Sequence, residues 1–254
     1  MKKNIAIVLC GGKGSRISEI TKIIPKSLIK INKKPIIWFV ISYLINSGIK
    51  KIILPLGYKG NQIRNYIKKE FQHHLEKIDL IDTGRDTEIF ERIYKVKNLL
   101  SGYDNFLILN SDTVFDLNLK KFINFHNKNN FNITLSGIKM KSSWGSIIRK
   151  KNSIKLYKFI KNEVIDMYQL KGFNKYEAFR NTGISIMKVK ILKTIKIKKK
   201  LDFESFFFNK IDDIGSFIFD GFWYPIETYK DYSQLKNDTI LKNRVKNLID
   251  KING

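Results

Sequence analysis

The chain has 254 residues, of which 43% are hydrophobic and 13% aromatic, so it can bury a core and is not a disordered tail. A single cysteine, Cys10, excludes a disulfide framework and a cysteine-cluster zinc site, and we expect it to be a small buried residue. The net charge of +25 would attract an anionic partner, but the lysines are spread along the chain without a recognition helix, so charge selects no partner. No apolar run is long enough to cross a bilayer and no export cleavage pattern follows the N-terminus. We therefore expect a cytoplasmic protein with neither a membrane nor a nucleic acid as its partner.

The first half of the chain alternates short apolar strands with amphipathic helices. Strands separated by helices of this length form right-handed βαβ units. The pattern therefore predicts the α/β class, with a three-layer, Rossmann-like and mostly parallel sheet that helices cover on both faces. The predicted strands span residues 5–9, 51–56, 77–81, 106–110 and 132–137, and the predicted helices 35–46, 61–71, 87–100 and 118–127.

The second half is less regular. A hairpin is predicted over residues 145–161, with its turn at Lys151 and Asn152, followed by strands at 181–187 and 216–223 and a closing helix at 229–252. No linker, repeat or low-complexity block divides the chain. We expect one domain over residues 1–254, with a first half (1–140) and a second half (141–254) that includes the closing helix.

A glycine-rich turn follows the first predicted strand. In an open parallel sheet, ligands bind beyond the carboxyl ends of the strands. The turn reads Gly11-Gly12-Lys13-Gly14-Ser15-Arg16, in which the glycines let backbone N–H groups close around phosphate oxygens and the two cations add positive charge. The segment lacks the spacing of a Walker A loop and the third glycine of a dinucleotide fingerprint. A purely structural turn is the alternative.

Two further segments carry polar groups that suit phosphate chemistry. Pro25-Lys26-Ser27 offers a fixed cation for a second phosphate, although a solvated surface lysine is the commoner role. Asn110-Ser111-Asp112-Thr113 ends the fourth strand, where a carboxylate could hold Mg²⁺ and neutralise phosphate charge. An Asx turn or a helix cap is the alternative for Asp112.

Taken together, these segments resemble the sugar-1-phosphate nucleotidylyltransferases and, within that family, the glucose-1-phosphate cytidylyltransferases. The resemblance continues from Arg16 to Trp38 without a gap, and it includes residues 57–60, 82–87 and 221–228. It extends from residue 5 to about residue 231, which is nearly the whole chain. The implied fold is the glycosyltransferase-A-like nucleotidyltransferase fold, in which residues 1–140 would form the nucleotide-binding half and residues 141–254 the sugar-phosphate-binding half.

The resemblance implies a single displacement. A sugar 1-phosphate attacks the α-phosphorus of a nucleoside triphosphate, with CTP favoured, and pyrophosphate is released. The other product is an NDP-sugar for polysaccharide biosynthesis. The implied cofactor is Mg²⁺. No covalent intermediate is expected, so catalysis rests on alignment and charge neutralisation. The oligomeric state stays open, with a homo-oligomer as one option.

The resemblance also implies roles for particular residues. Arg16 and Lys26 are the expected catalytic residues, and Asp112 and Glu227 the expected metal ligands. The residues expected to bind the nucleotide follow the strand ends: Leu9, Gly11, Gly12, Lys13, Gly14, Ser15, Arg16, Lys26, Thr83 and Ser111. Those expected to bind the sugar phosphate are Lys26, Asn181, Glu204 and Lys161.

The chain departs from the cytidylyltransferase pattern at several positions. Residues 88–92 read Glu-Ile-Phe-Glu-Arg where relatives have Met-Thr-Gly-Gly-Arg, and Glu227 replaces an aspartate. Ser111 and Thr113 replace the glycines on either side of Asp112, and Thr182 replaces a glycine of the sugar segment. Altered specificity pockets are therefore expected, which leaves open another base, a non-glucose acceptor, or a non-catalytic nucleotide-binding regulator. The histidines, His73, His74 and His126, have no ligand-like spacing, and we expect all three at the surface.

Overall fold

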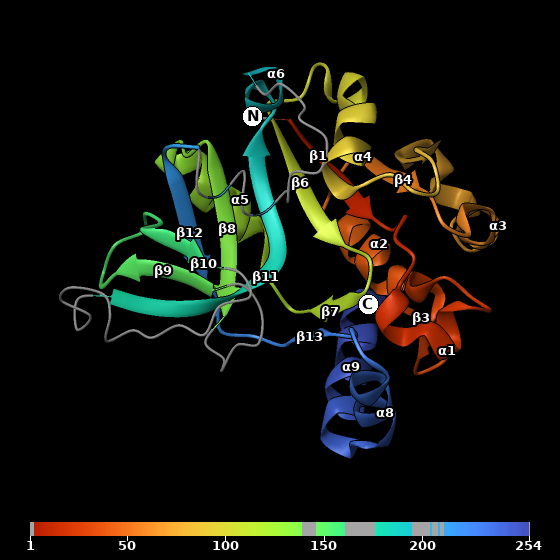
Figure 1. The fold of residues 1–254 in the computed structure, drawn as a ribbon. Helices are drawn as coiled ribbons and strands as arrows, with labels where there is room; N and C mark the ends of the chain where they lie inside the picture. The colour runs from red at the N-terminus through yellow and green to blue at the C-terminus, as the bar shows by residue number, and fades with distance from the viewer. Residues whose placement is uncertain are drawn as a thin grey trace.

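The computed structural model describes residues 3–138, 146–160, 176–194, 204, 208 and 211–253, and Figure 1 shows their arrangement. In this described part, the strands form one nine-stranded sheet and two small two-stranded ribbons. None of the helices described there is both long enough and apolar enough to pass through a lipid bilayer.

Four parallel strands form the N-terminal half of the large sheet, in the order β6-β1-β4-β5. Three of them, β1, β4 and β6, are mostly apolar and buried, as expected for strands that are covered on both faces, whereas the edge strand β5 carries two aspartates and is mostly half-buried. The strands are β1 (Asn4–Leu9), β4 (Ile52–Leu56), β5 (Ile78–Asp82) and β6 (Asn105–Asn110). The helices and 3₁₀ turns between them are η1 (Ser15–Ile17), α1 (Ser18–Thr21), η2 (Lys26–Leu28), α2 (Ile36–Asn46), α3 (Gly60–Glu70), η3 (Gln72–Lys77), α4 (Ile89–Lys95) and η4 (Lys97–Leu100).

The long strand β11 (Tyr176–Lys188) joins the second half to the first. It runs antiparallel to β6 on one side and to β8 (Ile133–Ile138) on the other, and its first residues pair with β9 (Ser146–Lys150). The predicted hairpin is present as β9 and β10 (Lys158–Ile160), with Asn152 in the left-handed region at φ 60°. The remaining elements nearby are α5 (Leu119–Asn129), α6 (Lys190–Thr194) and β12 (Ile214–Ile218), which is parallel to β8.

Two hydrophobic layers cover the two faces of the sheet. Ala6 and Val8 of β1 pack with α2, α3, α5 and the C-terminal helices, whereas Ile5 and Ile7 pack with α4 and α6. Successive side chains of a strand point to opposite faces, so one apolar strand serves both layers. The predicted fold class, a three-layer α/β structure around a mostly parallel central sheet, is confirmed.

Three predicted elements are divided in the structure. The helix predicted at 87–100 is interrupted at Val96, which separates α4 from η4. The strand predicted at 216–223 is wrong as one element: β12 ends at Ile218, and a new strand β13 (Trp223–Pro225) pairs with β7 (Thr113–Phe115) in a separate ribbon. The closing helix predicted at 229–252 is α8 (Tyr229–Asn237) and α9 (Thr239–Asn253).

The division between α8 and α9 has a clear cause. The carboxylate of Asp238 accepts hydrogen bonds from the backbone N–H groups of Ile240 and Leu241 at 2.8 and 3.0 Å. This is the N-cap arrangement, which begins a new helix and ends the preceding one.

A small antiparallel hairpin, β2 (Lys30–Ile31) and β3 (Lys34–Pro35), forms the second of the two-stranded ribbons and was not expected from the sequence.

Candidate active site

The loops that follow β1, β4 and β5 are tied together by one buried side chain, Arg92 of α4, which is only 4% exposed. Its guanidinium donates to the carbonyl oxygens of Gly11 and Leu56 at 3.0 and 3.1 Å. It also donates to Thr83 Oγ1 at 2.6 Å and to the carbonyl oxygen of Gly84 at 2.9 Å. A planar group with five N–H donors can bridge several carbonyls at once, which a lysine cannot do. Arg92 thereby fixes the positions of these three loops relative to one another.

Glycines are needed at two positions of the loop after β1. A Cβ at Gly11 would lie 2.5 Å from the guanidinium carbon of Arg92, so the side chain there must be hydrogen. Gly14 has a φ of 64°, in the left-handed region that favours glycine. A Cβ at Gly14 would also lie 3.2 Å from Cβ of Lys26. The loop therefore brings its backbone close to the side chain that the sequence marks as a phosphate-binding cation.

The β7–β13 ribbon positions the two carboxylates of the site. Asp112 immediately precedes β7, and Glu227 follows β13. The antiparallel register pairs Thr113 with Pro225, and the N–H of Ile226 donates to the carbonyl oxygen of Asp112 at 3.0 Å. The register therefore brings Asp112 and Glu227, which are far apart in the sequence, to the same end of the ribbon.

Four charged side chains meet at this end of the ribbon. Lys26 Nζ lies 2.6 Å from Asp112 Oδ2, and Arg16 Nη1 lies 2.8 Å from Glu227 Oε2. We call these four residues the charge cluster. Burial and, to a smaller extent, the charge of Asp112 together raise the pKa of Glu227 to about 7, against the opposing effects of Lys26 and Arg16. Asp112 and Glu227 thus act on one another as neighbouring like charges.

The residues of the charge cluster fit a Mg²⁺ ion. Their two carboxylates supply hard oxygen donors, and the field that each exerts on the other would be relieved by a divalent cation. Mg²⁺ commonly uses one or two protein carboxylates and completes its shell with water and substrate phosphates. Among the described residues, no group of three or more His, Cys, Asp or Glu side chains is placed to hold a metal. The two carboxylates of the charge cluster are the number of protein ligands that this mode of Mg²⁺ binding uses.

The other predicted nucleotide-side residues lie around the same strand ends. The carbonyl oxygen of Leu9 accepts from the N–H of Ser111 at 3.2 Å, which joins the ends of β1 and β6. Thr83 is buried, and its hydroxyl donates to the carbonyl oxygen of Leu56 at 2.7 Å. Lys13 lies apart from the charge cluster, and its Nζ pairs with Asp86 Oδ1 at 2.6 Å on the exposed surface.

Two of the predicted sugar-side residues lie together as a second group, Asn181 on β11 and Glu204 beyond its end. Asn181 Nδ2 donates to Glu204 Oε1 at 3.2 Å. The register of β11 against β8 shifts between Asn181 and Ser185, and Gly183 there has a φ of 73°. A Cβ at Gly183 would lie 2.5 Å from Nδ2 of Asn110, so the irregular part of β11 packs directly against the end of β6. Lys161, also predicted on this side, lies outside the described residues.

Arg180 is a neighbour of both groups that the sequence analysis did not identify. Its guanidinium lies over the ring of Trp223 at 4.5 Å, and its charge lowers the pKa of Glu227. The ring nitrogen of Trp223 donates to the carbonyl oxygen of Thr182 at 3.0 Å, which joins β13 to β11. No motif marks Arg180, because its role depends on the pairing of strands that are distant in the sequence.

Two expectations about single residues have clear outcomes. Cys10 is buried at 6% exposure, as predicted. The prediction for His126 is wrong: the ring is fully buried, with Nδ1 2.8 Å from Thr134 Oγ1 and Nε2 3.3 Å from Asn105 Oδ1. Polar partners on β8 and β6 make burial of this imidazole tolerable, and the sequence did not reveal them.

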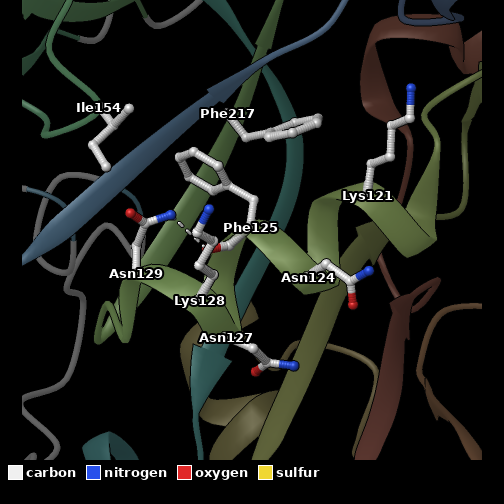
Figure 2. Close-up of a pocket in the computed structure, with 8 residues that line it drawn as sticks. All are labelled: Lys121, Asn124, Phe125, Asn127, Lys128, Asn129, Ile154 and Phe217. Atoms are coloured by element: carbon white, nitrogen blue, oxygen red, sulfur yellow. Dashed lines mark hydrogen bonds between the residues drawn. The ribbon is translucent and has the colours of Figure 1, made fainter.

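One hollow in the described part of the chain lies away from the charge cluster. It is an open groove of about 670 Å³ over α5, and its lining includes Phe125, Phe217, Lys121 and Lys128. Figure 2 shows these side chains, which come from α5, β12 and the segment around Ile154. None of the predicted site residues lines this groove.

Comparison with known proteins places this arrangement in a class. The structure of HddC from Yersinia pseudotuberculosis superposes with a TM-score of 0.73 at 22% identity, covering 92% of this chain and 97% of the other. A putative glucose-1-phosphate thymidylyltransferase from Bacillus anthracis superposes with a TM-score of 0.77 at 15% identity, covering 94% and 96%. The fold is therefore the glycosyltransferase-A-like fold of the nucleotidyltransferases.

Sequence comparison gives the family. The family described as nucleotidyl transferase matches residues 5–160, so the chain belongs to it. A probable glucose-1-phosphate cytidylyltransferase of Bacillus subtilis is 27% identical over 248 residues, covering 89% of this chain and 92% of its own length. A D-glycero-α-D-manno-heptose 1-phosphate guanylyltransferase of Campylobacter jejuni is 30% identical over 237 residues, covering 89% and 96%. The predicted family is confirmed: this chain is a sugar-1-phosphate nucleotidylyltransferase.

Proposed function

We propose that the protein transfers a nucleoside monophosphate, with CMP favoured, from a nucleoside triphosphate to a sugar 1-phosphate in a Mg²⁺-dependent reaction that releases pyrophosphate. The observation that carries this proposal is the charge cluster at the ends of β1 and β6, where two cations and two carboxylates converge. Such a set can bind phosphates and a divalent ion at the same place. We keep the division of labour expected from the sequence, with the nucleotide bound by residues 1–140 and the sugar phosphate by 141–254.

The side chains act by binding and alignment. Arg16 and the amides of Gly11 to Gly14 hold the triphosphate, and Lys26 holds the α-phosphate together with the attacking phosphate. Both cations are paired with carboxylates in the structure, so incoming phosphate oxygens must replace these partners. Asp112 and Glu227 hold Mg²⁺, which when bound neutralises phosphate charge. No side chain needs to act as a nucleophile, because positioning supplies most of the rate enhancement in a direct displacement.

The preference for CMP rests on the cytidylyltransferase-like motifs at residues 57–60, 82–87 and 221–228, and on the name of the Bacillus subtilis relative. The competing choice is GMP with a heptose 1-phosphate, which the name of the Campylobacter jejuni relative describes for that protein. Residues 88–91 differ from the cytidylyltransferase pattern and form the start of α4, with Ile89 46% exposed. This segment is therefore where the choice of base or sugar is expected to differ.

A pyrophosphate-release screen tests the proposal. It crosses the four common ribonucleoside triphosphates and dTTP with glucose, mannose and heptose 1-phosphates, each with Mg²⁺ and with excess EDTA. Turnover that requires one triphosphate, one sugar 1-phosphate and Mg²⁺ is expected, with CTP fastest. Turnover with another base would correct the CMP assignment alone. Triphosphate binding without turnover across the panel would instead favour a non-catalytic regulator on the same fold.

A further inference from the structure

A second cationic site lies on the hairpin side of the C-terminal helices. A cavity of about 180 Å³ is enclosed between the β2–β3 hairpin and the helices α8 and α9. Its apolar residues are the buried Ile31 and Leu235 and the half-buried Tyr232. Four exposed lysines also line it: Lys30, Lys33, Lys236 and Lys242. The volume of the cavity is about six times the volume that one water molecule occupies in the liquid, so the cavity can admit a small solute.

The four lysines have no carboxylate partner within the described residues, where the structure does record ion pairs for other lysines such as Lys34 with Glu70. The two acidic residues nearest to these lysines along the helices direct their carboxylates to backbone N–H groups and form no recorded ion pair with them. Asp231 accepts from the N–H groups of Glu227 and Thr228, and Asp238 accepts from those of Ile240 and Leu241. The cavity therefore combines four lysines for which no ion pair is recorded among the described residues, and like charges held together favour a bound anion.

Two of these lysines occupy positions in the chain that are unfavourable for a lysine. Lys33 adopts a φ of 70° in the hairpin turn, next to Asn32 at 46°. A two-residue turn with two positive φ values usually has glycine at its second position, so a lysine there is strained. Lys242 lies in the first turn of α9, where the helix dipole is already positive and a cation is unfavourable. Backbone strain and an unfavourable charge persist where something else compensates for their cost, and a bound anion would compensate for the charge of Lys242.

We propose that this cavity is a binding site for a phosphoryl dianion, either inorganic phosphate or the phosphate group of a small phosphorylated metabolite, distinct from the charge cluster. The amide of Asn32 already holds the hairpin to α9 by donating to the carbonyl oxygen of Lys242 at 3.2 Å. A dianion adds charge-assisted hydrogen bonds between the same two elements. The hairpin begins four residues after Lys26, and α8 begins two residues after Glu227, so the site joins the two segments that lead to the charge cluster.

The test compares two double variants that remove equal charge from the same helices. Lys236→Gln/Lys242→Gln alters the cavity, and Lys230→Gln/Lys246→Gln alters exposed lysines that do not line it. Calorimetric titration with sodium phosphate, at constant ionic strength set with sodium chloride, measures binding to wild type and to both variants. Both variants keep the charge cluster, so phosphate bound there contributes equally. We expect about tenfold weaker phosphate binding in the cavity variant, or loss of one binding event, and no change in the control.

Lys33→Gly separates binding from folding. Because glycine is unstrained at this turn position, the variant is expected to unfold at the same or a higher temperature without phosphate. It should nevertheless gain less thermal stability from phosphate than wild type does.

Titration with glycerol 3-phosphate distinguishes the two sources of the phosphoryl group. Tighter binding than that of inorganic phosphate indicates a phosphorylated metabolite, and weaker binding indicates the free ion. Equal phosphate binding by the two double variants, or a phosphate effect no larger than that of chloride, would overturn the proposal.

Discussion

Lys26 and Asp112 are 86 positions apart in the sequence, and their Nζ and Oδ2 atoms are 2.6 Å apart in the structure. Both side chains are largely enclosed, with 17% and 26% of their surface exposed. This ion pair joins the cation that we propose to hold phosphate with the carboxylate that we propose to hold Mg²⁺.

The first prediction concerns Asp112. Asp112→Asn keeps the size of the side chain and removes the charge that would hold Mg²⁺, so we expect a loss of turnover on the order of 10³-fold in the pyrophosphate-release assay. The matched control is Asp116→Asn, since Asp116 lies nearby in the sequence but pairs with Lys251 on the exposed surface. Asp112→Asn with most of its activity intact would refute the metal assignment.

The second prediction compares two adjacent glycines. Gly11→Ala places a methyl group 2.5 Å from a guanidinium that its hydrogen bonds hold in place, so we expect destabilisation of about 1 to 3 kcal/mol by urea denaturation. Gly12→Ala meets no atom within 4 Å and should change the free energy of unfolding by less than about 0.5 kcal/mol. If the two variants unfold at the same urea concentration, Arg92 does not restrain the loop as described.

The third prediction concerns Arg92 itself. Arg92→Met removes the charge-assisted hydrogen bonds that tie the carbonyl oxygens of Gly11, Leu56 and Gly84 to one side chain, so we expect a loss of about 2 to 4 kcal/mol in the free energy of unfolding. Arg92→Lys keeps the charge but not the fork of donors, and should still raise the KM for the triphosphate more than it lowers kcat. Arg85→Met, at an exposed position, serves as the control. Equal effects of Arg92→Met and Arg85→Met on stability would contradict the bridging role.

The fourth prediction is a pH dependence at Cys10. Burial raises the pKa of this thiol to about 12, so folding favours the protonated form. The stabilisation that the buried, protonated thiol contributes is complete at pH values below the thiol pKa of the unfolded chain. It declines as the pH rises from there towards 12, by up to about 1.4 kcal/mol per pH unit. The difference in the free energy of unfolding between wild type and Cys10→Ala should therefore shrink at alkaline pH. Alkylation by iodoacetamide at pH 8 should be slow in the folded protein and fast in urea.

Local patterns in the sequence predicted most of the first half. The apolar run before Gly11 predicted β1, and Pro35 and Gly48 correctly marked the limits of α2. The same reasoning made one helix of α8 and α9, because the capping role of Asp238 is visible only once its carboxylate is seen to accept the two N–H groups beyond it. It also assigned His126 to the surface, because the polar partners that permit its burial come from β6 and β8.

The sequence by itself determined the chemical groups of the candidate site and the strand ends that carry them, because glycine turns, buried strands and charged residues are local properties of the chain. Only the tertiary structure decided which groups meet. The pairing of β7 with β13 brings Glu227 to Asp112, and the fork of Arg92 joins three loops that are separate in the sequence. These contacts depend on strand register and on packing between distant segments, and no local preference of the residues specifies them.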